Sequence, residues 1–130
     1  MSYFTRRRAR RAASVHNART ALISLPVVTW FPREYTEDAH RDIADVQATV
    51  KTARGYVRRS SAAGLLLRDA DVWLTGWLDL WEHERIQPPH LSALYGRMIE
   101  HLTRVSERLS LVEDMEKRNV DTGRWPYGTE

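Results

Sequence analysis

The chain has 130 residues, a formal net charge of +3 and no cysteine, with 42% apolar and 28% charged residues. This length and composition are those of one globular domain with a modest core, and they argue against a wholly disordered chain. The lack of cysteine excludes a disulfide framework, a thiolate zinc site and a thiol nucleophile. Arginine far outnumbers lysine, which is typical of a GC-rich genome such as that of an actinobacterium or its phage.

The positive charge is concentrated at the N-terminus, where residues 1–33 hold seven arginines and no acidic residue. Five of these arginines lie in the stretch RRRARR at positions 6–11, and residues 34–130 are mildly acidic. Such a block of like charge predicts an interaction segment. We interpret residues 1–33 as a basic arm followed by an extended segment, 34–120 as a helical bundle and 121–130 as an irregular aromatic tail.

Residues 20–35 contain two prolines, Pro26 and Pro32, that favour an extended segment with Trp30 and Phe31 buried against the bundle. A secretory leader or a transit peptide is a weaker interpretation of the N-terminus, because the apolar run is short and no small-residue cleavage site follows it. No apolar run approaches the ~20 residues that span a bilayer. We expect a soluble cytoplasmic protein that does not associate with membranes, with a virion component as the alternative.

The strongest helical pattern lies at 89–118, where apolar residues recur with alternating spacings of four and three from Leu91 to Val112. Pro88 and Pro89 suit the first turn of this helix. Leu102 lies at the centre of the stripe, and we interpret Ser106 as lying off it. Three residues widen the stripe beyond a two-position seam, which favours packing in a bundle over a two-stranded coiled coil: Leu94, Ile99 and Met115.

Two further helices are predicted at 37–58 and 62–86, which gives an all-α small helical bundle of three helices. The second carries most of its apolar residues within a 160° arc on a wheel of 100° per residue, with Val72 as the one large apolar residue outside it. Ser60 or Ser61 and Gly64 favour a break between the two helices, although one continuous helix is an alternative. The prolines at 88 and 89 predict an antiparallel hairpin of helices 62–86 and 89–118.

The search for catalytic chemistry yields little. Glu37 and His40 have the Glu-x-x-His spacing of di-iron bundles, but no second such pair follows. Asp69 and Asp71 are 200° apart on a helix and cannot act together as acid and base. Arg54–Tyr56 begins like an RNA-recognition strand motif, but the residues that follow do not continue it. We therefore expect no enzyme activity, no metal, no cofactor and no small-molecule substrate.

The arginine-rich arm is the main candidate for function. Its arginines scatter around a helical wheel, which is unlike a membrane-surface helix and favours a flexible polycation that contacts phosphates. The predicted nucleic-acid-binding residues are Arg6, Arg7, Arg8, Arg10, Arg11 and Arg19. Three cations at 54–59 could extend this surface. We hypothesise a non-enzymatic adaptor that binds nucleic acid or a nucleoprotein assembly without strong sequence specificity, through an arm (1–19) that is dispensable for stability.

The alternative is a purely protein-binding helical module, either regulatory or a phage-type assembly component, whose arm meets an acidic protein surface. Trp73, Trp77 and Trp81 form a ridge at four-residue spacing that is either core or an interface anchor. The predicted protein interface comprises this ridge together with Leu94, Ile99 and Met115. Because a small bundle cannot cover all of this apolar surface, we expect a homo-oligomer, most simply a dimer with Trp77 or Trp81 near the contact.

Overall fold

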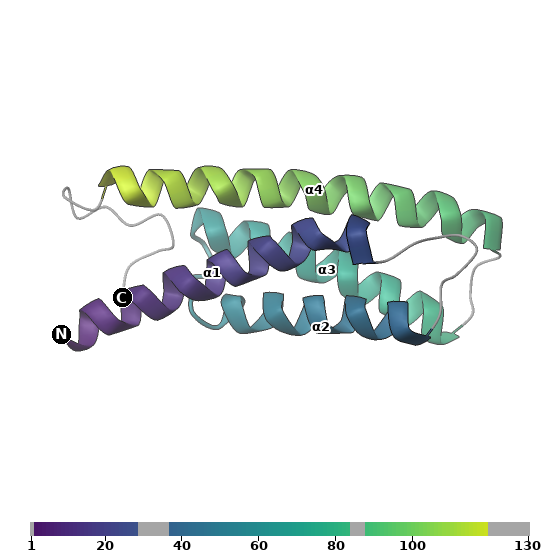
Figure 1. Ribbon diagram of the computed structural model, residues 1–130, viewed down its shortest axis with the longest axis horizontal. Helices are drawn as coiled ribbons and strands as arrows, with labels where there is room; N and C mark the ends of the chain where they lie inside the picture. Colours follow the sequence, from purple (N-terminus) through teal and green to yellow (C-terminus); the bar gives the residue numbers. More distant parts are fainter. Residues whose placement is uncertain (1, 29–36, 84–87, 120–130) are drawn as a thin grey trace.

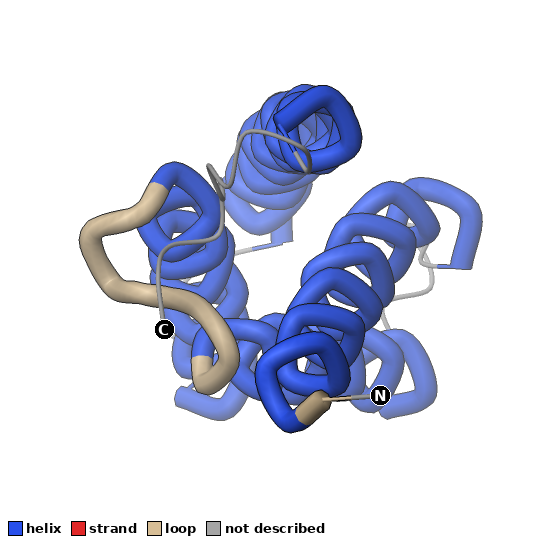
Figure 2. Tube along the Cα trace, turned by 90° about the vertical axis from the view of Figure 1, so that its left-hand side faces the viewer, coloured by secondary structure: helices blue, strands red, loops and turns tan. Residues whose placement is uncertain are grey.

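The computed structural model describes residues 2–28, 37–83 and 88–119, and within these ranges the chain forms four α-helices and no strand. The helices are α1 (Tyr3–Val28), α2 (Glu37–Arg54), α3 (Ala62–His83) and α4 (Pro88–Asn119). Each helix runs antiparallel to the one before it (Figure 1). Contacts join α1 to α2 and α4, and α3 to α2 and α4, so the helices stand at the corners of a square (Figure 2). The predicted all-α bundle is confirmed as an up-down-up-down arrangement.

The N-terminal region differs from the predicted arm and extended segment, because residues 3–28 form a single helix. The second half of α1 packs into the core through residues spaced by three and four, Val15, Ala18, Leu22 and Leu25, none of them more than 1% exposed. The bundle therefore has one helix more than predicted. The prediction for 20–28 was wrong because Pro26 lies in the last turn of α1, where the chain leaves the helix anyway; Trp30 and Phe31 lie outside the described residues.

The other helices bury the stripes that the sequence predicts. Residues at the three-four spacing of α2 are buried from Ala39 to Ala53, and those of α4 from Tyr95 to Val112. The break between α2 and α3 is also as predicted, although α2 ends at Arg54 rather than at residue 58. Ser61 caps α3, since its Oγ accepts a hydrogen bond from the backbone N–H of Gly64 at 3.0 Å.

Ser106 corrects the predicted face of α4, because its side chain is only 1% exposed. Ser106 lies one turn beyond Leu102 and so shares its face, and α4 has two neighbours, α1 and α3, that together cover a wide arc. The hydroxyl of Ser106 donates a hydrogen bond to the carbonyl oxygen of Thr103 at 2.7 Å. This hydrogen bond gives the buried hydroxyl a partner in place of the water from which helix packing has removed it.

The corrected face of α4 gives a test with two leucines on one helix. Leu102 is 1% exposed and Leu111 is 62% exposed. We expect Leu102→Ala to lower the free energy of unfolding by about 2–5 kcal/mol, because it leaves a cavity in the core. Leu111→Ala should change it by no more than about 0.5 kcal/mol. Urea denaturation followed by circular dichroism measures both, and equal losses would contradict the assigned face.

Candidate nucleic-acid interface

The first two turns of α1 form a positively charged segment. Arg6, Arg7, Arg8 and Arg10 are all exposed. Ser2 caps this helix, since its Oγ accepts a hydrogen bond from the backbone N–H of Thr5 at 3.2 Å. The first turn contains no acidic residue, so the arginines add to the positive end of the helix dipole. A negative ligand is favoured at such a terminus.

Two of the predicted arginines lie elsewhere on α1. Arg11 is 3% exposed and belongs to the buried side of the helix. Arg19 donates a hydrogen bond from its Nε to Glu113 of α4, and the Nδ1 of His16 lies 3.0 Å from the other oxygen of the same carboxylate. Arg11 and Arg19 thus face the bundle, and the sequence alone did not separate them from the exposed four.

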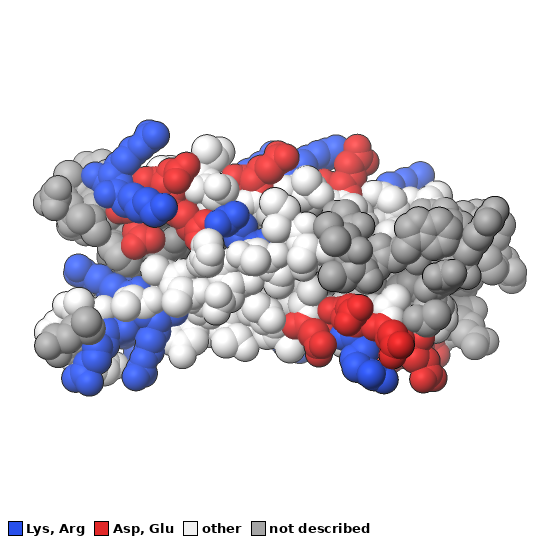
Figure 3. All heavy atoms as spheres, in the orientation of Figure 1, with Lys and Arg blue, Asp and Glu red and all other residues white. Residues whose placement is uncertain are grey.

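The turn between α2 and α3 brings a second group of arginines to the same end of the bundle. Residues 54–68 contain four arginines and no acidic residue. A pocket of about 200 Å³ joins this turn to the first turns of α1, and Figure 2 shows the two segments side by side. We name this surface the basic end, and its exposed arginines are Arg6, Arg7, Arg8, Arg10, Arg58, Arg59 and Arg68. Figure 3 shows Lys and Arg over the first turns of α1, basic and acidic side chains together over the neighbouring end of α4, and mainly acidic side chains over the start of α2 at the opposite end.

Gly64 holds the turn against α3. A Cβ atom at this position would lie 2.1 Å from the carbonyl oxygen of Arg58 and 2.9 Å from that of Arg59. The sequence predicts only that Gly64 favours a break between the helices, and the structure shows in addition a close approach of backbone that only glycine permits. As a result, Arg54, Arg59 and Arg68 line one pocket beside Gly64.

One arginine of this group, Arg54, forms an ion pair with a buried carboxylate. The carboxylate of Asp71 is 5% exposed and accepts hydrogen bonds from Arg54 and, at 3.1 Å, from the hydroxyl of Thr75. Gln47 donates to the hydroxyl of Thr75 at 2.6 Å and completes this link between α2 and α3. The burial of Asp71 rests on these partners, because a buried charge needs them.

Several exposed arginines of the basic end have no such compensation. Arg6, Arg7, Arg10, Arg59 and Arg68 form no ion pair with any carboxylate in residues 2–28, 37–83 and 88–119. Arg7 donates one hydrogen bond to the hydroxyl of Tyr3, and the remaining guanidinium donors are available to an anion such as phosphate. These five arginines are thus cations without a partner carboxylate among the described residues, on a fixed backbone.

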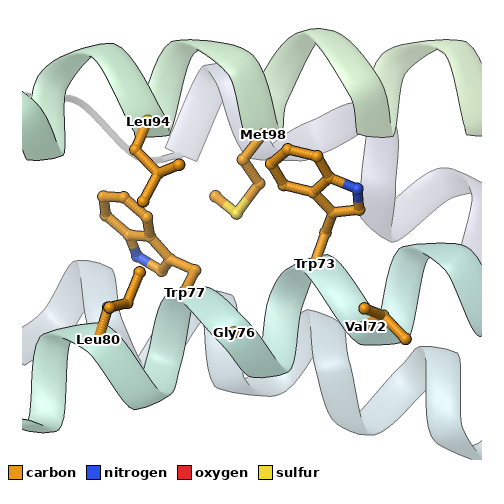
Figure 4. A pocket seen from close by; sticks show the side chains of 7 residues that line it. All are labelled: Val72, Trp73, Gly76, Trp77, Leu80, Leu94 and Met98. Carbon is orange, nitrogen blue, oxygen red and sulfur yellow. The ribbon is translucent and has the colours of Figure 1, made fainter.

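The predicted protein interface divides into separate parts. Trp73, Trp77 and Leu94 line an apolar groove of about 200 Å³ between α3 and α4, together with Val72, Gly76, Leu80 and Met98 (Figure 4). Trp77 is only 3% exposed, while Val72 is 61% exposed at the rim of the groove. The sequence marked Val72 as the apolar residue outside the arc, and this was the available signal for the groove.

The other predicted interface residues do not line this groove. Trp81 is half-buried and its ring lies 6.0 Å from that of His40. Ile99 packs against the core. Met115 is 49% exposed, four residues beyond the exposed Leu111.

Among the described residues no group of three or more His, Asp or Glu side chains is placed to hold a metal ion. Nor does any helix in this part of the chain have the length and apolar character needed to cross a membrane. The chain matches no protein-family model, and neither a curated protein nor a solved structure shows significant similarity to it.

The close approach at Gly64 provides a test of how the basic end is held in place. Gly64→Ala should lower the free energy of unfolding by roughly 1–3 kcal/mol, because the new methyl group must push backbone atoms apart. Gly96→Ala is the matched control within α4, where no atom lies within 4 Å of the added Cβ. The control should be neutral or stabilising by up to about 1 kcal/mol. Thermal denaturation distinguishes the two, and a neutral Gly64→Ala would contradict the close packing of the turn.

Proposed function

We propose that the protein is a non-enzymatic helical adaptor that binds nucleic acid through the basic end, without strong sequence preference. The observation that carries this proposal is that two segments without acidic residues lie together at one end of the bundle. Residues 3–28 and 54–68 are far apart in the sequence and contain arginines and no acidic residue. Tyr56 of the second segment lines one pocket with Tyr3, Arg6, Arg7 and Arg10 of the first.

A line of phosphates is the ligand that suits this surface. Arginine side chains contact phosphate oxygens through two parallel N–H donors, and each neutralised phosphate releases a condensed counterion. Contacts of this kind position a protein on nucleic acid and carry no sequence information. The acidic side chains over the start of α2 (Figure 3) would orient the bundle so that the basic end approaches the polyanion first.

The structure also determines which variants can test the proposal. Deletion of residues 1–19 would remove Val15 and Ala18, both 0% exposed, from the core. The burial of these residues argues against the expectation that the segment is dispensable for stability, and loss of binding after truncation would be confounded with unfolding. Substitution of exposed arginines avoids this difficulty.

We expect the triple substitution of Arg6, Arg7 and Arg10 by Gln to weaken the binding of a mixed-sequence oligonucleotide. The slope of log K against log salt concentration should become less steep by about 2–3, since each lost phosphate contact removes nearly one unit. Fluorescence anisotropy at several salt concentrations measures this slope for DNA and for RNA.

The matched control removes the same charge from other surfaces of the bundle. Arg41, Arg97 and Arg104 are exposed residues of α2 and α4, and their substitution by Gln should leave the salt slope close to that of the unmodified protein. An equal loss in both triple variants would indicate a diffuse charge effect and contradict a localised interface. Unchanged binding in the first variant would point to another partner, such as an acidic protein surface.

The apolar groove favours a second activity, self-association into a dimer. Gly76 leaves open space in the groove, and Val72 projects from the rim one turn earlier on α3. Val72 is a projection and Gly76 a hollow, four residues apart on the same helix. When two copies of α3 pack antiparallel about a two-fold axis, each Val72 lies at the Gly76 of the other copy, so the surface is self-complementary. We propose that a second copy of this chain occupies the groove.

Light scattering at micromolar concentration tests the dimer. Gly76→Leu should give a monomer, because the new side chain fills the space that receives Val72, while the fold has room for it. Gly96→Leu is the control on α4, where an added Cβ also meets nothing within 4 Å, and this variant should remain a dimer. A monomer in the unmodified protein, or a dimer in Gly76→Leu, would contradict this assignment.

A further inference from the structure

The exposed aromatic side chains of the described residues gather at the basic end. Tyr3, Phe4 and Tyr56 are 63%, 59% and 37% exposed. The other large apolar side chains with comparable exposure are aliphatic: Ile23, Leu65, Val72, Leu111 and Met115. An exposed aromatic ring contributes little to the core, so its placement needs another reason.

These rings are interleaved with the arginines. Tyr3 and Tyr56 line the same pocket as Arg6, Arg7 and Arg10, although they come from α1 and from the turn after α2. Arg7 donates a hydrogen bond from its Nη1 to the hydroxyl of Tyr3 at 3.2 Å. The rings of Tyr3 and Phe4 meet edge to face, with centroids 5.5 Å apart and planes at 73°. Their orientations are thus set by neighbours on the first turns of α1, which Ser2 caps.

Aromatic rings beside guanidinium groups match the two chemical parts of an unpaired nucleotide. A base can stack on the ring while its phosphate contacts the cation, and every base presents a π face for such stacking. A duplex hides these faces inside its own stack and offers the protein mainly its phosphates. Aliphatic side chains at positions 3, 4 and 56 would serve a purely electrostatic surface equally well.

We propose that the basic end binds single-stranded nucleic acid, with unpaired bases stacked on Tyr3, Phe4 and Tyr56 and phosphates held by Arg6, Arg7 and Arg10. This inference rests on the proposed function and assigns its ligand class. It adds an attraction that does not depend on salt to the electrostatic one, and it is tolerant of sequence because stacking uses the face of the base rather than its edge.

The experiment compares a mixed-sequence single strand of about 12 nucleotides with an abasic strand of the same length and phosphate count. Both strands are prepared as labelled DNA for fluorescence anisotropy, and the base-bearing strand is also prepared as RNA. We expect the unmodified protein to bind the base-bearing strand roughly 10-fold or more tightly than the abasic one. The triple variant Tyr3→Leu, Phe4→Leu and Tyr56→Leu should bind the base-bearing strand no better than the abasic strand, with the salt slope unchanged.

The conservative variant Tyr3→Phe keeps the ring and serves as the matched control. It should retain the preference for bases, whereas a preference that depended on the hydroxyl and its hydrogen bond with Arg7 would be lost. Equal affinity of the unmodified protein for both strands would overturn the stacking inference and leave the electrostatic function standing. A lack of binding to either strand would overturn both. If the Leu variant also lost affinity for the abasic strand, the rings would act through the shape of α1, and stacking would again be overturned.

Discussion

The packing of the second half of α1 against α2 and α4 is the interaction on which the rest of the structure depends. A helix whose first turns carry arginines at the positive end of its own dipole is unfavourable by itself. The burial of Val15, Ala18, Leu22 and Leu25 offsets this cost, and the ion pair of Arg19 with Glu113 joins α1 to α4. Helix formation is cooperative, so the packed half supports the charged half.

A packed α1 changes the physical nature of the basic segment. A flexible polycation loses backbone entropy when it is ordered on a ligand. Arginines on a formed helix have lost that freedom during folding, and only their side chains remain to be ordered. The same rigidity allows residues from distant parts of the chain, such as Arg10 and Tyr56, to line one pocket. A surface of this kind exists only in the folded bundle.

The sequence predicted the elements whose apolar pattern is heavy and uninterrupted. The stripes of α2 and α4 and the aromatic load of α3 define helices by periodicity alone, and Ser61 defines the cap. The stripe of α1 was overlooked because Ala18 and Arg11 occupy two of its buried positions, so the charge of the segment outweighed its period. Ser106 was predicted to lie off the buried stripe of α4 for a related reason. The additional helix, α1, packs against α4, and a bundle of four helices buries positions that a three-helix bundle leaves exposed.

The surroundings of the site residues also could not be predicted from local sequence patterns. Arg6 and Arg11 look alike in sequence, and only the position of the neighbouring helices decides that one is exposed and the other buried. Gly64 has no sequence signal that separates a loose turn from a close backbone contact. The proximity of Tyr3 to Tyr56 arises from the antiparallel path of α1 and α2, which no local pattern contains. Long-range placement of this kind follows from the topology.

The two proposed activities constrain each other through the direction of α3. A two-fold contact between Val72 and Gly76 sets the two copies of α3 antiparallel, with the axis near residue 74. The basic end lies at the start of α3, roughly 18 Å along the helix from that axis at 1.5 Å per residue. The two basic ends of a dimer would therefore lie on opposite sides, about twice that distance apart.

A strand long enough to reach both would be held by two sites, and the second contact would form at a high effective concentration. A short strand would gain nothing from the dimer, so dependence of affinity on strand length connects the groove to the basic end.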